Sequence, residues 1–218
     1  MSIIIGFDTE YVRQGREFSM PEPDGKQNRV LSYQFYVLDG GTGREGGLVI
    51  PVPNGQKLTG RSTLASLLGR TFEFALRQGV IDHVPDNIIL AAHFSRADLP
   101  SLRDFDKLKS SVDAVRRTYV SAKQPFVRNV TINGRTHRLS IRLLDTMLLA
   151  PNGHQSLAAL GEMLGVEKIA LPEGMIERMD VLQSGNRELF DRYALRDAEI
   201  AAKWIMNVQE FFENDLGL

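Results

Sequence analysis

Apolar residues at the start of the chain follow the pattern of β-strands. The run 3–7 is apolar and rich in β-branched residues, which is typical of a buried strand. After a polar segment at 13–29, which reads as a loop, residues 30–38 and 47–52 predict two further strands around a turn at Gly40-Gly41. Short links between three consecutive strands favour an antiparallel meander.

Helical spacing begins in the next stretch. Residues 58–79 carry leucine, phenylalanine and alanine three and four positions apart, and this spacing predicts an amphipathic helix. Thr59 or Ser62 would cap its first turn, and Gly79 would end it. Residues 87–92 are apolar but too few for a typical helix, so they predict a fourth buried strand.

The second half of the chain predicts a hairpin and two more helices. Asn133-Gly134 is typical of a type I′ turn, and the strands around it would occupy 116–144. Residues 156–164, with Gly165 behind them, and residues 186–212 both show helical spacing.

The order of these elements predicts an α/β fold with a mixed central sheet flanked by helices. A length of 218 residues suits a single domain, 1–218, and we interpret the segment at about 104–144 as an inserted basic β-hairpin. Hydrophobic residues make up 43% of the chain and charged residues 24%, which is ordinary for a globular protein.

Composition also narrows the class of protein. The chain has no cysteine, so disulfides and thiolate metal sites are excluded. No apolar run approaches the length of a membrane span, and the N-terminus lacks a signal-type core. We therefore expect a cytoplasmic protein without a membrane partner.

Charge is distributed unevenly along the chain. The net charge is −1, yet segment 96–142 has 11 Lys and Arg against four Asp and Glu, so it carries +7 and the remainder carries −8. A basic face beside an acidic pocket suits a polyanionic substrate such as nucleic acid. A solvated basic insertion without a partner is the alternative.

Acidic residues stand at positions where strands and helices present side chains. Asp8 and Glu10 project from one face of the first strand, because strand side chains alternate. Asp98 follows the fourth strand, near the start of an expected helix with Leu99, Leu102 and Phe105. Tyr193 and Asp197 share one face of the last helix. The plain alternatives are solvated acids at a strand end, an N-cap at Asp98 and a surface helix pair.

In this order and spacing, the residues resemble the DEDD (DnaQ-like) family of 3′–5′ exonucleases, which have a ribonuclease H-like fold. Asp8-Thr9-Glu10 matches the first motif, and His93 followed five residues later by Asp98 matches the second. The segment from Tyr193 to Asp197 matches the YxxxD motif of the tyrosine (DEDDy) subclass.

The region between the second and third motifs adds to this resemblance. Residues 144–146 and 156–165 look like the same region in proofreading domains of family B DNA polymerases, with the phage and linear-plasmid, protein-primed group nearest. The natural-looking start at Met1 and the helical finish favour a stand-alone exonuclease over an excised proofreading domain. A polymerase, or another replication, repair or defence protein, is a conceivable partner, and the oligomeric state is not predicted.

The resemblance implies a nuclease that removes nucleotides from the 3′ ends of single-stranded nucleic acid, DNA in preference to RNA. Oxygen ligands without His or Cys select two hard divalent cations, Mg²⁺ or Mn²⁺. In the family, the residue matching Asp8 bridges both ions, those matching Glu10 and Asp197 hold the nucleophile-side ion, and that matching Asp98 helps hold the other. Tyr193 would orient the attacking water, because a phenol is a poor base at neutral pH.

Substrate contacts are expected from the three motifs, from the interval before the last motif and from the basic hairpin. Phe94 departs from the family pattern, because many members carry Asn at this position. The expected substrate-binding residues are Thr9, His93, Phe94, Arg96, Lys168, Arg138 and Arg142. Phe94, Phe126 and Tyr119 are candidates for stacking on unpaired bases, with core packing as the alternative for each.

Two rival functions remain open from the sequence. The chain could be a catalytically inert nucleic-acid-binding or polymerase-partner module that keeps the fold, which the change at Phe94 would suit. It could also be a 3′–5′ exoribonuclease, because discrimination of RNA depends on contacts with the 2′-hydroxyl that sequence does not place.

Overall fold

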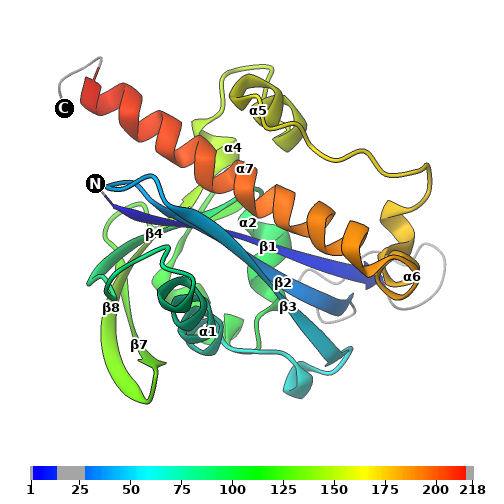
Figure 1. Cartoon of the computed structure of the whole chain (residues 1–218), viewed down its shortest axis with the longest axis horizontal. Coiled ribbons are helices and arrows are strands. Elements are labelled where there is room, and N and C mark those ends of the chain that lie inside the picture. Colours follow the sequence, from blue (N-terminus) through cyan, green and yellow to red (C-terminus); the bar gives the residue numbers. More distant parts are fainter. Residues whose placement is uncertain (1, 14–27, 215–218) are drawn as a thin grey trace.

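A six-stranded mixed sheet forms the centre of the computed structural model, which describes residues 2–13 and 28–214 (Figure 1). In spatial order the strands are β3 (Glu45–Gly55), β2 (Asn28–Asp39), β1 (Ile3–Arg13), β4 (Asn87–Ala92), β8 (Arg135–Asp145) and β7 (Phe126–Ile132). Strands β3, β2 and β1 pair antiparallel, which confirms the predicted meander. Strand β4 runs parallel to both β1 and β8, and β7 closes the sheet antiparallel to β8.

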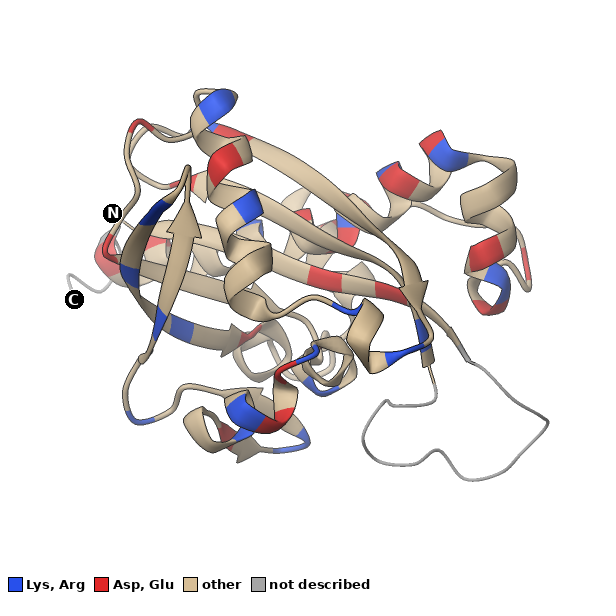
Figure 2. Cartoon of the chain, turned by 90° about the horizontal axis from the view of Figure 1, so that it is seen from below, with Lys and Arg blue, Asp and Glu red and all other residues tan. Residues whose placement is uncertain are grey.

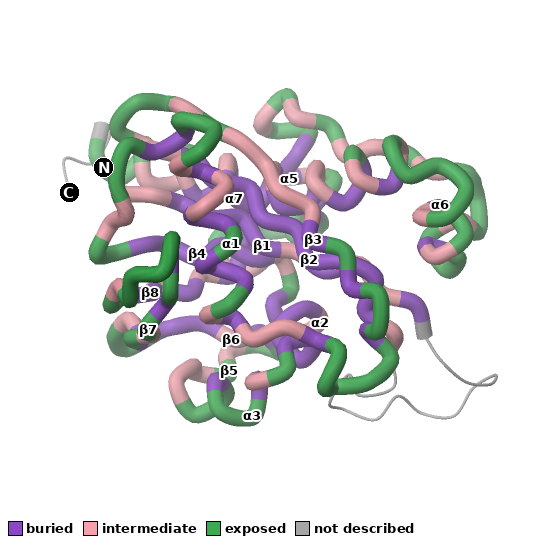
Figure 3. The backbone as a smooth tube through the Cα atoms, turned by 60° about the horizontal axis from the view of Figure 1, so that its bottom comes forward, coloured by how far each residue is buried: buried purple, intermediate pink, exposed green. Residues whose placement is uncertain are grey.

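Helices cover both faces of this sheet, as the sequence predicts. Helix α1 (Leu64–Arg77) packs against one face, and the long helix α7 (Arg187–Asn214) crosses the other (Figure 1). The central strands β1, β2 and β4 are buried along most of their length (Figure 3). A mixed sheet between two helical layers is compatible with a ribonuclease H-like fold.

Side chains of β1 divide between the two helical layers. Ile5 and Phe7 join the core beneath α1, and Ile4 joins the smaller core beneath α7. Because strand side chains alternate, Asp8 and Glu10 extend the series that begins at Ile4 and lie on the α7 face. The apolar half of β1 thereby fixes the direction of its two carboxylates.

Helix α7 lies close to β1, because both elements carry small residues where they cross. A Cβ atom at Gly6 would stand 1.9 Å from the main-chain oxygen of Ala198. Ala198, Ala201 and Ala202 form the side of α7 that packs over the strand. Glycine at position 6 is therefore required by the approach of the two backbones.

The first helix differs from its predicted form at its N-terminus. Residues 58–60 form a short 3₁₀ helix, and α1 begins only at Leu64. Thr63 is its N-cap, with its hydroxyl accepting a hydrogen bond from the Ser66 amide at 3.2 Å. The expected caps Thr59 and Ser62 are wrong, whereas the end at Gly79, with φ of +69°, agrees with the prediction.

This difference predicts the effect of two neighbouring substitutions. Thr63→Ala should lower the free energy of unfolding by about 1 kcal/mol, because the Ser66 amide loses its side-chain acceptor. Ser62→Ala, one position earlier, should change it by less than about 0.5 kcal/mol. Urea denaturation of both variants measures the difference, and the reverse order of effects would contradict the assignment of the cap.

The β7–β8 hairpin is part of the central sheet and not an insertion into it. The turn at Asn133-Gly134 is as predicted, and both residues have positive φ. However, the C-terminal half of β8 pairs with the whole of β4, from Asn87 against Ser140 to Ala92 against Asp145. The sequence indicates the turn but not the distant partner strand, and for this reason the hairpin was predicted as an insertion.

Two further segments are broken where the sequence predicts continuous elements. Before the Asn133-Gly134 turn, the chain forms two strands, β6 (Thr118–Val120) and β7, where a single hairpin strand was expected. Strand β6 pairs with β5 (Asp113–Val115) in a separate small sheet. The expected helix after the fourth strand is split into α2 (Ser95–Asp98), a 3₁₀ turn and α3 (Phe105–Leu108). Leu102 is extended between them, although the expected apolar residues are all buried.

The remaining helices flank α7. Helix α5 (Leu157–Leu164) has the predicted ends, with Ser156 as N-cap and Gly165 in the left-handed conformation. Helices α4 (Thr146–Leu149) and α6 (Met179–Gly185) were not predicted. None of the helices in the described part of the chain is long and apolar enough to cross a membrane. Most of the predicted loop 13–29 lies outside the described residues.

Candidate active site

Four acidic side chains converge where β1, α2 and α7 meet. Asp8 and Glu10 lie on the α7 face of β1 and remain partly exposed, whereas Asp98 at the end of α2 and Asp197 on α7 are buried. The charges of Asp8, Asp98 and Asp197 all raise the pKa of Glu10, and Asp8 and Asp197 each raise the pKa of another member. We call Asp8, Glu10, Asp98 and Asp197 the acid cluster.

Asp98 is tied to β1 by a side-chain hydrogen bond. The hydroxyl of Thr9 donates to Asp98 Oδ1 at 2.6 Å, and both residues are buried. Asp98 makes no capping hydrogen bond to the following 3₁₀ turn, so the N-cap alternative for this residue is wrong. The Thr9 hydroxyl, which was expected to bind substrate, therefore orients the Asp98 carboxylate of the acid cluster.

A lysine lies against the α7 side of the acid cluster. The ammonium of Lys168 donates to Asp197 Oδ2 at 2.6 Å and lies 5.5 Å from the centre of the Tyr193 ring. The segment between α5 and α6 that carries Lys168 thus returns to α7. Lys168, which was expected to bind substrate, thus lies beside the two named residues of the third motif.

Ionisation of the acid cluster is strongly opposed by its surroundings. Burial, followed by the charge of Asp197, raises the pKa of Asp8 to about 7. Burial and the charges of Asp8 and Asp197 raise the pKa of Glu10 well above its usual value. Burial and then Asp8 do the same for Asp98. The pKa of Asp197 is also raised by burial, although Lys168 partly offsets this effect.

The other titratable groups keep their neutral or cationic forms. Burial raises the pKa of Tyr193 to about 12, so its phenol stays protonated and is unsuited to act as a base at neutral pH. Burial would lower the pKa of Lys168, but Asp197 outweighs it and the pKa is raised. Several acids therefore face one ammonium, which leaves unbalanced negative charge when the acids ionise.

The donor chemistry of the acid cluster fits hard divalent cations. All its candidate ligand atoms are carboxylate oxygens, and Asp197 Oδ1 is buried without a hydrogen-bond partner among the described residues. As the side chains are placed, no three His, Asp or Glu residues in the described ranges are grouped closely enough to hold one ion. The acids, and Lys168 with them, would have to turn to receive a cation.

The segment between β4 and Asp98 is shaped by a residue that sequence reasoning missed as part of the site. Asp145, the last residue of β8, accepts hydrogen bonds from the main-chain amides of Phe94 and Ser95 at 3.1 and 2.6 Å. Next to it, the hydroxyl of Thr146 is 2.8 Å from His93 Nδ1. Burial lowers the pKa of His93 to about 4, so the ring is neutral at physiological pH.

Two of the predicted substrate-binding arginines lie along β8, away from the acid cluster. Lys and Arg recur along the β7–β8 hairpin (Figure 2). Arg138 and Arg142 share one face of β8, as predicted, and Arg138 is exposed. Arg138 precedes the end of the strand at Asp145 by seven residues, or roughly 23 Å. It is therefore placed to contact only nucleic acid that extends along the sheet.

The aromatic candidates differ in exposure. Phe126 is buried under the guanidinium of Arg128, and Tyr119 packs edge-on against Phe105. For these two residues the structure supports packing. Phe94 is 38% exposed at the start of α2, and Arg96 is exposed in the same helix.

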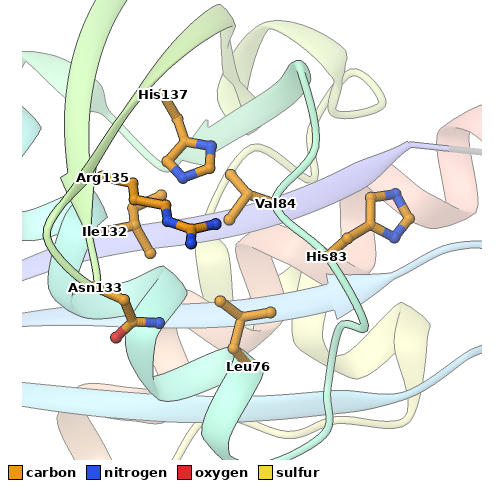
Figure 4. Close-up of a pocket in the computed structure, with 7 residues that line it drawn as sticks. All are labelled: Leu76, His83, Val84, Ile132, Asn133, Arg135 and His137. Carbon is orange, nitrogen blue, oxygen red and sulfur yellow. The ribbon is translucent and has the colours of Figure 1, made fainter.

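The two described hollows of the surface lie away from the acid cluster. One, of about 370 Å³, lies beyond the end of α1, and its lining residues include His83, Arg135 and His137 (Figure 4). The other, of about 540 Å³, lies between β3 and α6 and is lined partly by Arg29 and Asp180, which form a 2.7 Å ion pair. Neither contains a residue of the acid cluster.

Comparison with known proteins finds a relative among the curated proteins. Over 99% of its length, the chain is 34% identical to a protein of Escherichia coli described as the primer-independent DNA polymerase PolB. The chain spans 26% of the length of that relative. No protein-family model matches the chain. The chain is thus similar to one part of a DNA polymerase.

Proposed function

We propose that the protein is a metal-dependent 3′–5′ exonuclease that acts on single-stranded ends, with DNA as the preferred polymer. The acid cluster carries this proposal, because it gathers four carboxylates from distant segments against one lysine and one tyrosine. Such an arrangement of like charges is costly unless cations or protons neutralise it. The similarity to part of a protein described as a DNA polymerase supports DNA over RNA.

The chemistry divides among the residues of the site. Asp8, Glu10, Asp98 and Asp197 would hold Mg²⁺ or Mn²⁺, and two such ions supply charge neutralisation and an activated water at the scissile phosphate when bound. Thr9 keeps Asp98 oriented toward β1 through its hydroxyl. Tyr193, which stays protonated, orients the water by hydrogen bonding. Lys168 adds positive charge beside Asp197, which would help to stabilise the negative charge of the phosphate.

The direct test uses single strands labelled at the 3′ or the 5′ end, in DNA and RNA versions, with Mg²⁺, with Mn²⁺ and with EDTA. We expect the 5′-labelled strand to shorten stepwise, the 3′ label to leave as a mononucleotide, and EDTA to stop both. Faster shortening of DNA than of RNA would support the preferred polymer. Binding without turnover in either metal would contradict the proposal and favour an inert binding module.

Lys168 provides a second prediction. Lys168→Met keeps the length of the side chain but removes its charge, and we expect the cleavage rate to fall about 10²-fold. Lys123→Met removes a lysine from the exposed loop before β7 and serves as the matched control. The rates of both variants are measured at saturating metal. Equal rates in the two variants would exclude a special role for Lys168.

A further inference from the structure

Both oxygens of the Asp145 carboxylate accept hydrogen bonds from main-chain amides, which belong to the segment after β4 and to α4. Asp145 is 1% exposed, and its Oδ1 accepts from Phe94 at 3.1 Å and from Met147 at 3.0 Å. Its Oδ2 accepts from Ser95 at 2.6 Å. A carboxylate with both oxygens engaged in this way stays in one orientation, because each amide would be left buried and unpaired if it turned.

These hydrogen bonds fix the turn that leads from β4 to the acid cluster. Phe94 has φ of +59° and ψ of +53°, a conformation that residues other than glycine and asparagine rarely adopt. Ser95 is also held from the other side, because its hydroxyl bridges the main-chain oxygen and amide of Tyr119. Asp98 follows on the single turn of helix that begins at Ser95.

The same turn also sets the direction of Phe94. Because the backbone is left-handed at this residue, its ring extends from the turn and stays partly exposed, whereas Ser95 and Asp98 are buried. One carboxylate thus governs the placement of two groups: the acid Asp98 and the exposed aromatic ring next to it.

We propose that Asp145 is a positioning residue of the active site, which holds Asp98 in place to receive a cation and Phe94 in place to contact the terminal nucleotide. This inference rests on the proposed exonuclease function. Asp145 acts through the amides of Phe94 and Ser95 and does not itself touch substrate or metal.

The variant Asp145→Asn tests this role with the smallest change of shape. The amide group keeps one accepting oxygen but places an NH₂ group against one of the donating amides, so the turn must shift. Asp104→Asn is the matched control, because Asp104 also accepts a main-chain amide from a distant element, that of Leu64 at 3.0 Å. Asp104 lies on the α1 side of the sheet, next to the first residue of that helix.

Two measurements on the full chain separate positioning from general stability. In Asp145→Asn, we expect the Mn²⁺ concentration for half-maximal cleavage to rise about 10- to 100-fold in protein that is still folded at the assay temperature. Hydrogen exchange should become faster in the peptide covering 93–98 and stay unchanged in peptides from α1. Asp104→Asn should leave both the metal requirement and this peptide unaffected.

The outcomes also distinguish this inference from the proposed function. If wild-type protein cleaves and Asp145→Asn keeps its metal requirement, Asp145 is not a positioning residue. If both variants raise the requirement equally, the effect is general and the inference fails. If wild-type protein does not cleave, the function fails. The inference then rests on whether Asp145→Asn speeds exchange at 93–98 and weakens the thermal stabilisation that Mn²⁺ gives to wild-type protein, and it fails if neither occurs.

Discussion

Asp8→Asn is expected to reduce nucleotide release by about 10³-fold or more while leaving the protein folded. Asp8 stands at the centre of the acid cluster, where its charge raises the pKa of both Glu10 and Asp98. The substitution therefore removes the negative charge and one of the two oxygens with which residue 8 would hold a cation. The measurement is the rate of 3′-label release in Mg²⁺ and in Mn²⁺.

The same substitution has a second expected effect that distinguishes loss of chemistry from loss of fold. Asn at position 8 removes one of several like charges, so the melting temperature Tm should hold or rise at neutral pH. Asp86→Asn changes an exposed aspartate just before β4 and is the matched control for both measurements. Cleavage by pure Asp8→Asn protein at the wild-type rate would rule out the proposed site.

Gly6→Ala is expected to have the largest effect on stability, at least about 3 kcal/mol. The added methyl group would meet the main-chain oxygen of Ala198 at 1.9 Å, and backbone atoms on both sides cannot move independently. Helix α7 must then lift from β1 over the whole crossing. Urea denaturation followed by circular dichroism measures the loss, which at the upper end leaves no folded protein.

Gly185→Ala is the matched control for this prediction. Gly185 ends α6, and an added Cβ would meet no atom within 4 Å. Alanine is also the better helix former, so this variant should be as stable as wild type or slightly more stable. If Gly6→Ala and Gly185→Ala unfolded at the same urea concentration, the close crossing of α7 over β1 would be refuted.

Local patterns predicted most elements but not all their partners. The β-branched run in β1, the apolar stretch 87–92 and the Asn133-Gly134 turn each determine their own structure through neighbours in sequence. The pairing of β8 with β4 joins residues about 50 positions apart. No local pattern reports such a pairing, and for this reason the hairpin was misread as an insertion.

The acid cluster was found from the sequence because its members belong to spaced motifs, whereas Asp145 was missed as a site residue. The partners of Asp145 are main-chain amides, and amides carry no sequence signal. One available signal was its position, because an aspartate that ends an apolar strand must find donors if it is buried. The contact between Lys168 and Asp197 was also not predicted, because the two residues are 29 positions apart and no local pattern links them.

The crossing of α7 over β1 has a consequence for how this protein can change over time. Asp197 and Ala198 are adjacent on α7, and Asp8 lies two residues beyond Gly6 on β1. The separation of two acids of the cluster is thus set by direct backbone contact, with no adjustable side chain between them. Mutations that loosen this crossing would alter the spacing of the acid cluster and the stability together. A lineage could vary many exposed surface residues, but it could repair damage at this crossing only by restoring small residues.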